Sequence, residues 1–337
     1  MIQTRLTSML NIRHPVLQAA LGGIARAELA AAVSNAGALG TLAMIRMPPE
    51  FIRMQIRRTR ELTDRPFAVN LVPPVCPATG FESQLAICIE EQVPVISLFW
   101  CDAAPLVERC HAAGAKVMLQ VGSVIEARTA ADAGVDIIVA QGTEAGGHNR
   151  SETSLFALLP AIVEAVAPVP VLAAGSIVNG RGLAAVLCLG AQGGVVGTRF
   201  VASEESEAHP DYKQRLVDAR DGDTVLCDVF HIGWPPDSPH RVLKNALTNG
   251  AAPPEGPIAT MLRAQETIDL PPFSSATPSI HVTGRTELMA NYAGQGVGLI
   301  NEILPASKIV ERMAFEAEQA LRSTTCTIVF KSEGAPS

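Results

Sequence analysis

The stretch AKVMLQVGSVIEARTAADAGVDIIVAQ, residues 115–141, contains the repeating unit that decides the fold. A short apolar run at 115–121 is followed by a helix-like segment at 123–133 and by a second apolar run at 135–141. Both runs mostly lack polar alternation, which is typical of strands buried on both faces. Gly134 precedes the second run, and a left-handed glycine there would end the helix and return the chain to the sheet.

The same unit recurs along the first 200 residues. The eight apolar runs are 14–20, 37–44, 66–72, 93–99, 115–121, 135–141, 169–175 and 193–200. Helix-like segments between them include 25–36, 49–61, 103–113, 123–133, 155–166 and 180–189. This pattern favours an α/β protein with a closed (β/α)8 barrel, the TIM barrel. The alternative is an open doubly wound sheet. Such a sheet typically has a GxGxxG turn after its first strand, and the sequence contains no such motif.

The composition changes after residue 200. Residues 204–290 are rich in Pro, Asp, Ser and His and show no clear repeats, as in WPPDSPH at 234–240. We expect a smaller lid or substrate domain here, inserted after strand eight of a barrel formed by residues 1–203. Regular structure is expected to resume at 288–303 and in an amphipathic helix at 306–321, so that residues 291–331 complete the barrel.

Charge and cysteine content exclude several protein classes. The net charge is −7 and the one basic run, 57–60, is typical of a solvated helix face, so nucleic acid is not an expected partner. The seven cysteines form no CxxC pair, which fits neither a disulfide framework nor a zinc site.

The apolar stretch 155–178 is broken by three prolines and is better explained by a helix and a strand than by a membrane span. The N-terminus shows no secretory signal, so we expect a soluble cytoplasmic protein, and a homodimer by analogy with other barrel enzymes.

In TIM barrels the active site lies at the C-terminal ends of the strands, which converts the strand list into a list of candidate residues. The predicted ends carry Gln18, Ala19, Ala20, Met44, Asn70, Phe99, Gln120, Gln141, Gly175, Ser176, Gly197 and Thr198. This set has no carboxylate pair for glycoside hydrolysis, no cluster of metal ligands and no lysine for a Schiff base.

The glycine-containing ends of strands seven and eight, Gly175-Ser176 and Gly197-Thr198, suit a phosphate, because exposed backbone N–H groups there can hold an anion. The alternative is that these glycines serve only tight turns. The amides of Asn70, Gln120 and Gln141 suit a ring with alternating N–H and C=O groups, although each alone could be a structural polar residue.

The motif QGTEAGGH at 141–148 follows strand six and combines a glycine pair with one histidine. Histidine titrates near neutral pH and is the usual general base, so His148 is the candidate catalytic residue. The alternative is a structural histidine. The other six histidines are less well placed, and those at 209, 231, 240 and 281 fall in the expected lid region.

Several motifs resemble the nitronate monooxygenase family, formerly called 2-nitropropane dioxygenases. They are GTEAGGH at 142–148, AAGSIVNGRG at 173–182, GTRFVASEES at 197–206 and YAGQGVG at 292–298. The resemblance also covers HPVLQAALGG at 14–23, DRPFAVNL at 64–71 and PPDSPHRVLKN at 235–245. Flavin-dependent enoyl-thioester reductases and an NADH:quinone reductase group share several of these motifs.

The resemblance implies a TIM barrel that binds FMN, with a smaller domain over the flavin and His148 as the active-site histidine. It implies FMN contacts from Gln18, Ala19, Ala20, Asn70, Gln120 and Gln141, with Gly146 and Gly147 near the ring and the phosphate on Gly175, Ser176, Gly197 and Thr198. Two departures stand out. The chain has Gln18-Ala19-Ala20 where the family often has Ala-Pro-Met, and Ser176 replaces a frequent glycine, which would add a hydroxyl donor for the phosphate.

Three functions stay open at this point. The first is oxidation of alkyl or propionate-3-nitronate-like nitronates, or of nitroalkanes, by FMN and O₂. The second is an NAD(P)H-dependent flavin reductase that acts on an enoyl thioester or a quinone. The third is a barrel that binds another phosphorylated metabolite, or a flavin without turnover.

Overall fold

The computed structural model describes residues 1–263 and 266–327. Its centre is a sheet of eight parallel strands, which confirms the predicted barrel. The strands are β1 (Val16–Gln18), β2 (Gly40–Ala43), β3 (Phe67–Leu71), β4 (Val95–Phe99), β5 (Lys116–Val121), β6 (Ile137–Gln141), β8 (Val171–Ala174) and β9 (Gly194–Val196). They lie in the order β1-β9-β8-β6-β5-β4-β3-β2. The ring closes beside β2, where the N–H of Leu39 donates to the carbonyl of Val16 at 3.0 Å and its carbonyl accepts from Gln18 at 2.9 Å.

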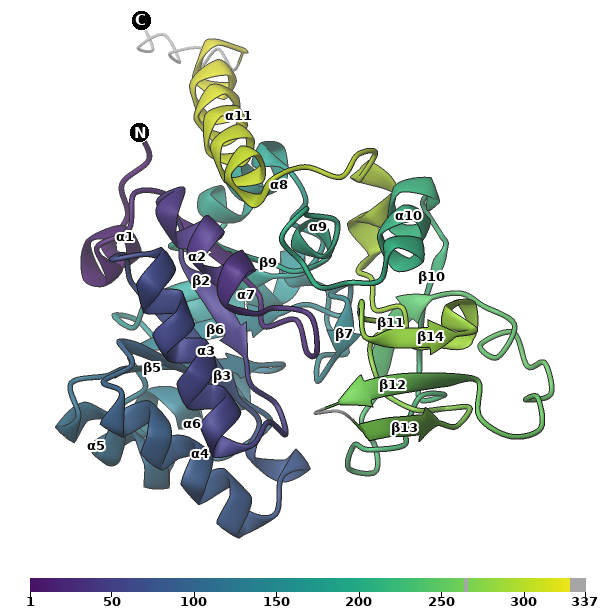
Figure 1. Cartoon of the computed structure of the whole chain (residues 1–337). Helices are drawn as coiled ribbons and strands as arrows, with labels where there is room; N and C mark the ends of the chain where they lie inside the picture. The colour runs from purple at the N-terminus through teal and green to yellow at the C-terminus, as the bar shows by residue number, and fades with distance from the viewer. Residues whose placement is uncertain (264–265, 328–337) are drawn as a thin grey trace, which may run out of the picture.

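Helices surround these strands. The strands and helices together form the barrel, which lies on one side of the molecule (Figure 1). The helices are α1 (Arg5–Leu10), α2 (Ala27–Asn35), α3 (Pro49–Leu62), α4 (Ala78–Glu90), α5 (Ala104–Ala112), α6 (Val124–Asp132), α7 (Leu155–Ala165), α8 (Gly180–Cys188), α9 (Thr198–Val201) and α11 (Ala306–Thr327). The sequence patterns did not predict α1 or α4. The predicted strand at 193–200 is too long, because β9 ends at Val196 and α9 begins at Thr198.

Glycine caps are present at the junctions between helices and strands, including the one predicted at Gly134. Gly37, Gly114, Gly134 and Gly190 have φ values of 91°, 78°, 83° and 98°. Most side chains lose several tenths to a few kcal/mol in this left-handed region, whereas glycine has no Cβ to clash. These residues therefore set the points at which each helix ends and the next strand begins.

The barrel interior is closed at one end by α1. Leu6 and Leu10 of this helix belong to the same buried cluster as Val95 and Ile137, which begin β4 and β6. The cluster also contains Leu17, Met118 and Leu172 from inside the barrel. Apolar side chains thus fill the N-terminal end of the barrel, and only the C-terminal end is open to a ligand.

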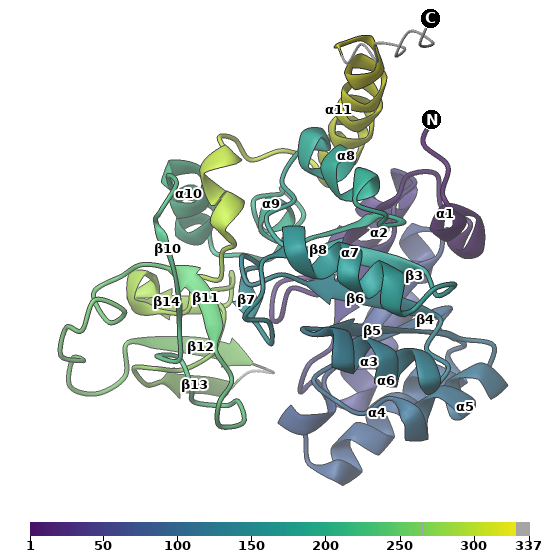
Figure 2. The ribbon, with the colours of Figure 1, turned by 180° about the vertical axis from the view of Figure 1, so that it is seen from behind.

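Two small antiparallel sheets lie beyond the C-terminal ends of the barrel strands (Figure 2). One contains β10 (Thr224–Cys227), β11 (His240–Leu243) and β7 (Gly147–His148), in that order. The other contains β13 (Glu266–Leu270), β12 (Ala259–Arg263) and β14 (Val282–Gly284). Below, the described part of residues 224–292 is called the cap. Helix α10 (Pro210–Asp218) connects the barrel to it.

The cap region contains more regular structure than its sequence suggested, because its strands are short and its loops are rich in proline. The regular structure expected at 288–303 is largely absent: only the 3-10 helices η2 (Thr286–Leu288) and η3 (Gln295–Leu299) occur there, as η1 (Pro73–Val75) does before α4. The expected helix at 306–321 is confirmed as α11, which packs on α8 and α2. The expected barrel segment 291–331 ends outside the described residues. No helix in the described ranges has the length and apolar character needed to cross a membrane.

Candidate functional site

A cavity of about 970 Å³ opens at the C-terminal ends of the barrel strands, under the cap. This volume is at the upper end of the usual range for ligand pockets. Every site residue proposed from the sequence lines it: Gln18, Ala19, Ala20, Asn70, Gln120, Gln141, Gly146, Gly147, His148, Gly175, Ser176, Gly197 and Thr198. Topology alone brings these residues together, since they come from six different strand ends. Phe99 also lines the cavity, whereas Met44 is not among its lining residues.

Free backbone donors lie at the ends of β8 and β9. Among the described residues, the N–H groups of Gly175, Ser176 and Gly197 have no protein acceptor. Gly175 has φ 140°, and a Cβ there would lie 3.3 Å from the side chain of Glu144. A cluster of unpaired donors on a glycine turn suits an oxyanion such as a phosphate.

The hydroxyl of Ser176 is engaged within the protein itself. Its Oγ accepts a hydrogen bond from the N–H of Gly296 at 3.0 Å and lies 3.5 Å from the carbonyl of Glu144. The hydroxyl therefore holds the segment around η3 against β8. Donation from this hydroxyl to a phosphate stays a prediction.

The amides differ in how much of their hydrogen-bonding capacity is free. Gln141 donates from Nε2 to the carbonyl of His148 at 2.9 Å and accepts at Oε1 from the N–H of Arg150 at 3.3 Å. Gln18 accepts from the N–H of Thr41 at 2.9 Å. These two amides position backbone. By contrast, the side-chain amide of Gln120 has no hydrogen-bond partner within the described residues and is free to contact a ligand.

His148 lies on β7, the short strand that joins the barrel chain to the cap sheet. It pairs with His240 of β11, and the two imidazoles are 5.1 Å apart between centroids. Its ring stacks on the indole of Trp234 at 3.4 Å, with an angle of 14° between the planes. Nε2 of His148 is buried and has no hydrogen-bond partner in the described residues.

Burial is the main electrostatic influence on this histidine. It lowers the pKa of His148 well below the usual value, and the nearby His240 and Arg46 lower it further. Desolvation disfavours the charged form of an imidazole, and a neighbouring cation does the same. His148 is therefore neutral near pH 7, so it can accept a proton or a hydrogen bond at Nε2 when that atom is the unprotonated one.

Sequence patterns did not single out four residues around His148. They are Arg46 after β2, Trp234 and His240 of the cap, and Tyr292, whose ring lies 5.5 Å from that of His148. His240 and Tyr292 stand inside the motifs PPDSPHRVLKN and YAGQGVG, so the family resemblance was the available signal. Trp234 begins the stretch WPPDSPH that suggested a lid region but gave no sign of a contact with His148, and Arg46 carried no signal.

Other site chemistries find little support. No group of three or more His, Cys, Asp and Glu side chains suited to a metal ion occurs in the described residues. The six cysteines whose side chains the structure describes are all unpaired. The cavity is lined by many apolar side chains, and its polar lining consists of backbone donors, amides, hydroxyls, two imidazoles and a few charged side chains.

Comparison with known proteins agrees with this geometry. The family model described as nitronate monooxygenase matches residues 3–78 and 74–316. The chain belongs to the nitronate monooxygenase family. It is therefore an oxidoreductase built on a TIM barrel.

Relatives within and around this family are named for different activities. A Mycobacterium tuberculosis protein named (3aS,4S,5R,7aS)-5-hydroxy-7a-methyl-1-oxo-octahydro-1H-indene-4-carboxyl-CoA dehydrogenase is 37% identical over 249 residues, which are 73% of this chain and 67% of that protein. The structure of FabK from Thermotoga maritima has a TM-score of 0.83 at 32% identity, covering 97% of this chain and 100% of that one. The nitroalkane oxidase from Streptomyces ansochromogenes has a TM-score of 0.76 at 29% identity, covering 95% and 99%.

Proposed function

We propose that this protein is an FMN-dependent enzyme that oxidises alkyl nitronates, of the propionate-3-nitronate type, or nitroalkanes, with O₂ as the oxidant. The observation that carries the proposal is the buried, unpartnered Nε2 of a neutral His148 in the cavity. Oxidation of a nitroalkane begins with loss of its α-proton, and a neutral imidazole inside an apolar pocket is suited to accept it. A carbon–oxygen bond then forms at the α-carbon with oxygen from O₂, the carbon–nitrogen bond breaks, and a carbonyl compound and nitrite are the products.

FMN fits the residues of the cavity. The unpaired N–H groups of Gly175, Ser176 and Gly197 would hold its phosphate, together with Thr198. Gln120 and Asn70 would contact the polar edge of its ring, and Gln18, Ala19, Ala20 and Gln141 would complete that wall. FMN would supply the electron transfer between the organic substrate and O₂.

The glycine pair before His148 is suited to a close approach of backbone to the flavin ring. A Cβ on Gly146 would lie 2.5 Å from the N of Gly294, and Gly147 has φ 81°. These two glycines therefore let residues 144–148 pack closely on the segment before η3 while carrying His148 into the cavity.

The test is an absorbance spectrum of the purified protein, followed by two assays. We expect a flavin spectrum, O₂-dependent nitrite release from an alkyl nitronate, and no rapid bleaching when NADH is added without oxygen. Colourless protein that cannot be reconstituted with FMN would contradict the cofactor proposal. Flavin protein that releases no nitrite would contradict the substrate proposal alone.

The size of the cavity favours a second candidate, the NAD(P)H-dependent reduction of an enoyl thioester or quinone. A volume of about 970 Å³ would accommodate a bulky substrate as well as a flavin. Rapid flavin bleaching by NADH under argon, reversed by an enoyl thioester or a quinone, would decide for this candidate. The lid role of residues 204–290, a cytoplasmic location and a homodimer stay predictions.

A further inference from the structure

Arg46 reaches the cavity from the loop between β2 and α3, on the side where the cap meets the barrel. Its backbone is left-handed, with φ 56°, a conformation uncommon for a residue other than glycine, asparagine or aspartate. The guanidinium of Arg263, on β12 of the cap, donates to the carbonyl of Arg46 at 3.2 Å. A strained backbone held by a second element is typical of residues whose placement serves a ligand.

The guanidinium of Arg46 has no acidic partner. Within the described residues it makes no ion pair and donates no hydrogen bond. The neighbouring Arg26 differs, because it donates to the carbonyl of Ala43 at 2.8 Å and lies 3.9 Å from Glu207. Arg46 is an exposed residue at the mouth of the cavity, and partial desolvation is the main cause that lowers its pKa. The mouth of the cavity thus carries a positive charge that no acidic side chain of the described residues pairs with.

The cap leaves space for this guanidinium at Gly233. A Cβ on Gly233 would lie 2.6 Å from Nη1 of Arg46, and the φ of this glycine is 98°. The next residue, Trp234, stacks on His148. One short cap segment thus positions both groups, and the charge of Arg46 is close enough to His148 to lower the pKa of that imidazole.

We propose that Arg46 and Nε2 of His148 form an oxyanion subsite that binds the planar, delocalised negative charge of the reacting substrate. This inference deepens the proposed function and rests on it for the identity of the substrate. A planar guanidinium matches two oxygens of a nitronate by paired hydrogen bonds, and the neutral imidazole beside it donates a further hydrogen bond in the tautomer that carries its proton on Nε2. An enolate formed from a thioester carries the same kind of charge, so the subsite serves either substrate class.

The two substrate classes make different demands on Arg46. A nitronate carries its charge before the reaction, so loss of Arg46 would raise KM more than it lowers kcat. A thioester gains charge only in the transition state, so loss of Arg46 would lower kcat with KM nearly unchanged. The ratio of these effects identifies the source of the oxyanion.

The first experiment measures binding of nitrate, a planar inert anion, to the purified holoprotein by calorimetry. We expect nitrate to bind the unmodified protein, and Arg46→Gln to weaken binding by between about tenfold and about 100-fold, the usual range for a charge-assisted hydrogen bond. Arg46→Lys is expected to restore part of the affinity, since it keeps the charge without the planar fork. Gly233→Ala is expected to weaken binding with Arg46 intact.

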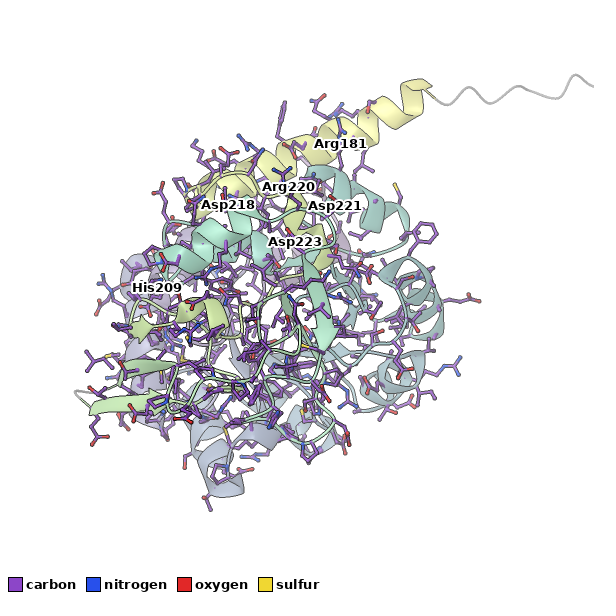
Figure 3. All side chains as sticks on the ribbon, turned by 90° about the vertical axis from the view of Figure 1, so that its right-hand side faces the viewer. Arg181, His209, Asp218, Arg220, Asp221 and Asp223 are labelled. Atoms are coloured by element: carbon purple, nitrogen blue, oxygen red, sulfur yellow. The ribbon has the colours of Figure 1, made fainter. Side chains whose placement is uncertain are left out.

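The matched control is Arg181→Gln. Arg181 is an exposed arginine on α8, on the outer surface near α11 (Figure 3), and this substitution is expected to leave nitrate affinity unchanged. Equal affinity in Arg46→Gln and the unmodified protein, or no nitrate binding by the unmodified protein, would overturn the subsite. Because nitrate is not turned over, this outcome is independent of whether nitrite is released from a nitronate.

Discussion

The barrel and the cap contribute different kinds of surface to the same cavity. The barrel contributes glycine turns, small side chains and amides at its strand ends, such as Gly175, Gly197 and Gln120. The cap contributes the aromatic and charged side chains Trp234, Tyr292 and Arg263. Backbone donors on glycine turns can hold an anion without any side chain. The cap side chains contact a ligand through their own shape and charge.

The largest expected effect lies where the two regions meet. With a neutral nitroalkane as the substrate, we expect His148→Ala to lower kcat/KM by between about 100-fold and about 10,000-fold, because it removes the proposed proton acceptor while leaving the barrel cradle intact. Flavin content should be unchanged, which its absorbance spectrum would check. The control is His111→Ala, at the opposite end of the barrel, where His111 pairs with Asp136. Undiminished turnover in His148→Ala would remove this residue from the mechanism.

The next largest effect should separate the stability of the two regions. Leu42 lies fully buried between the sheet and its helices, and Leu42→Ala is expected to cost about 2–5 kcal/mol of unfolding free energy. Leu262 on β12 is 56% exposed, and Leu262→Ala should change the unfolding free energy by no more than about 0.5 kcal/mol. Urea unfolding of both variants measures this difference. Equal losses would show that the cap depends on its side-chain packing as much as the barrel does.

A smaller effect concerns the cap residue stacked on the proposed base. Trp234→Ala would let water reach His148 and raise its pKa toward the usual value, because burial is the largest cause of the lowering. A base must be neutral, so the acid limb of the pH profile of kcat/KM should move to higher pH. Trp100→Phe is the control, since Trp100 contacts Trp234 at 5.7 Å but has no ring contact with His148. An unmoved limb in Trp234→Ala would contradict this account of the pKa.

The smallest expected effect is the acid dependence of stability. Burial lowers the pKa of His148, His240 and His14 below 6.5 in the folded protein. The unfolded chain then binds protons that the folded chain does not, so stability falls as the pH falls below about 6.5. Each histidine contributes at most about 1.4 kcal/mol per pH unit. Thermal unfolding between pH 7 and pH 5 should show a shallower slope in His148→Gln, whereas an unchanged slope would contradict the assignment.

Much of the barrel could be predicted because its determinants are local. Strands buried on both faces read as continuous apolar runs, and glycines such as Gly114 and Gly134 mark the helix ends. Helix α4 was missed because its start follows the proline-rich turn at η1 and contains Gly80, both typical of loops. The cap strands were missed because they are short and separated by proline-rich segments.

The candidate site was predicted in part, for a related reason. The strand ends of a barrel must converge, so residues such as Asn70 and Gly197 could be grouped from the sequence alone. Arg46, Trp234 and Tyr292 meet at His148 only through the packing of the cap on the barrel. No periodicity in the sequence encodes that packing. The left-handed backbone at position 46 could not be predicted either, because the residue there is an arginine and not a glycine or asparagine.

The two-residue strand β7 ties His148 to two parts of the molecule at once. On one side it pairs with His240 of β11 in the cap sheet, and on the other the side-chain amide of Gln141, at the end of barrel strand β6, donates to the carbonyl of His148. The imidazole is therefore placed by a splice between barrel and cap, and a substitution that loosens either anchor would displace it.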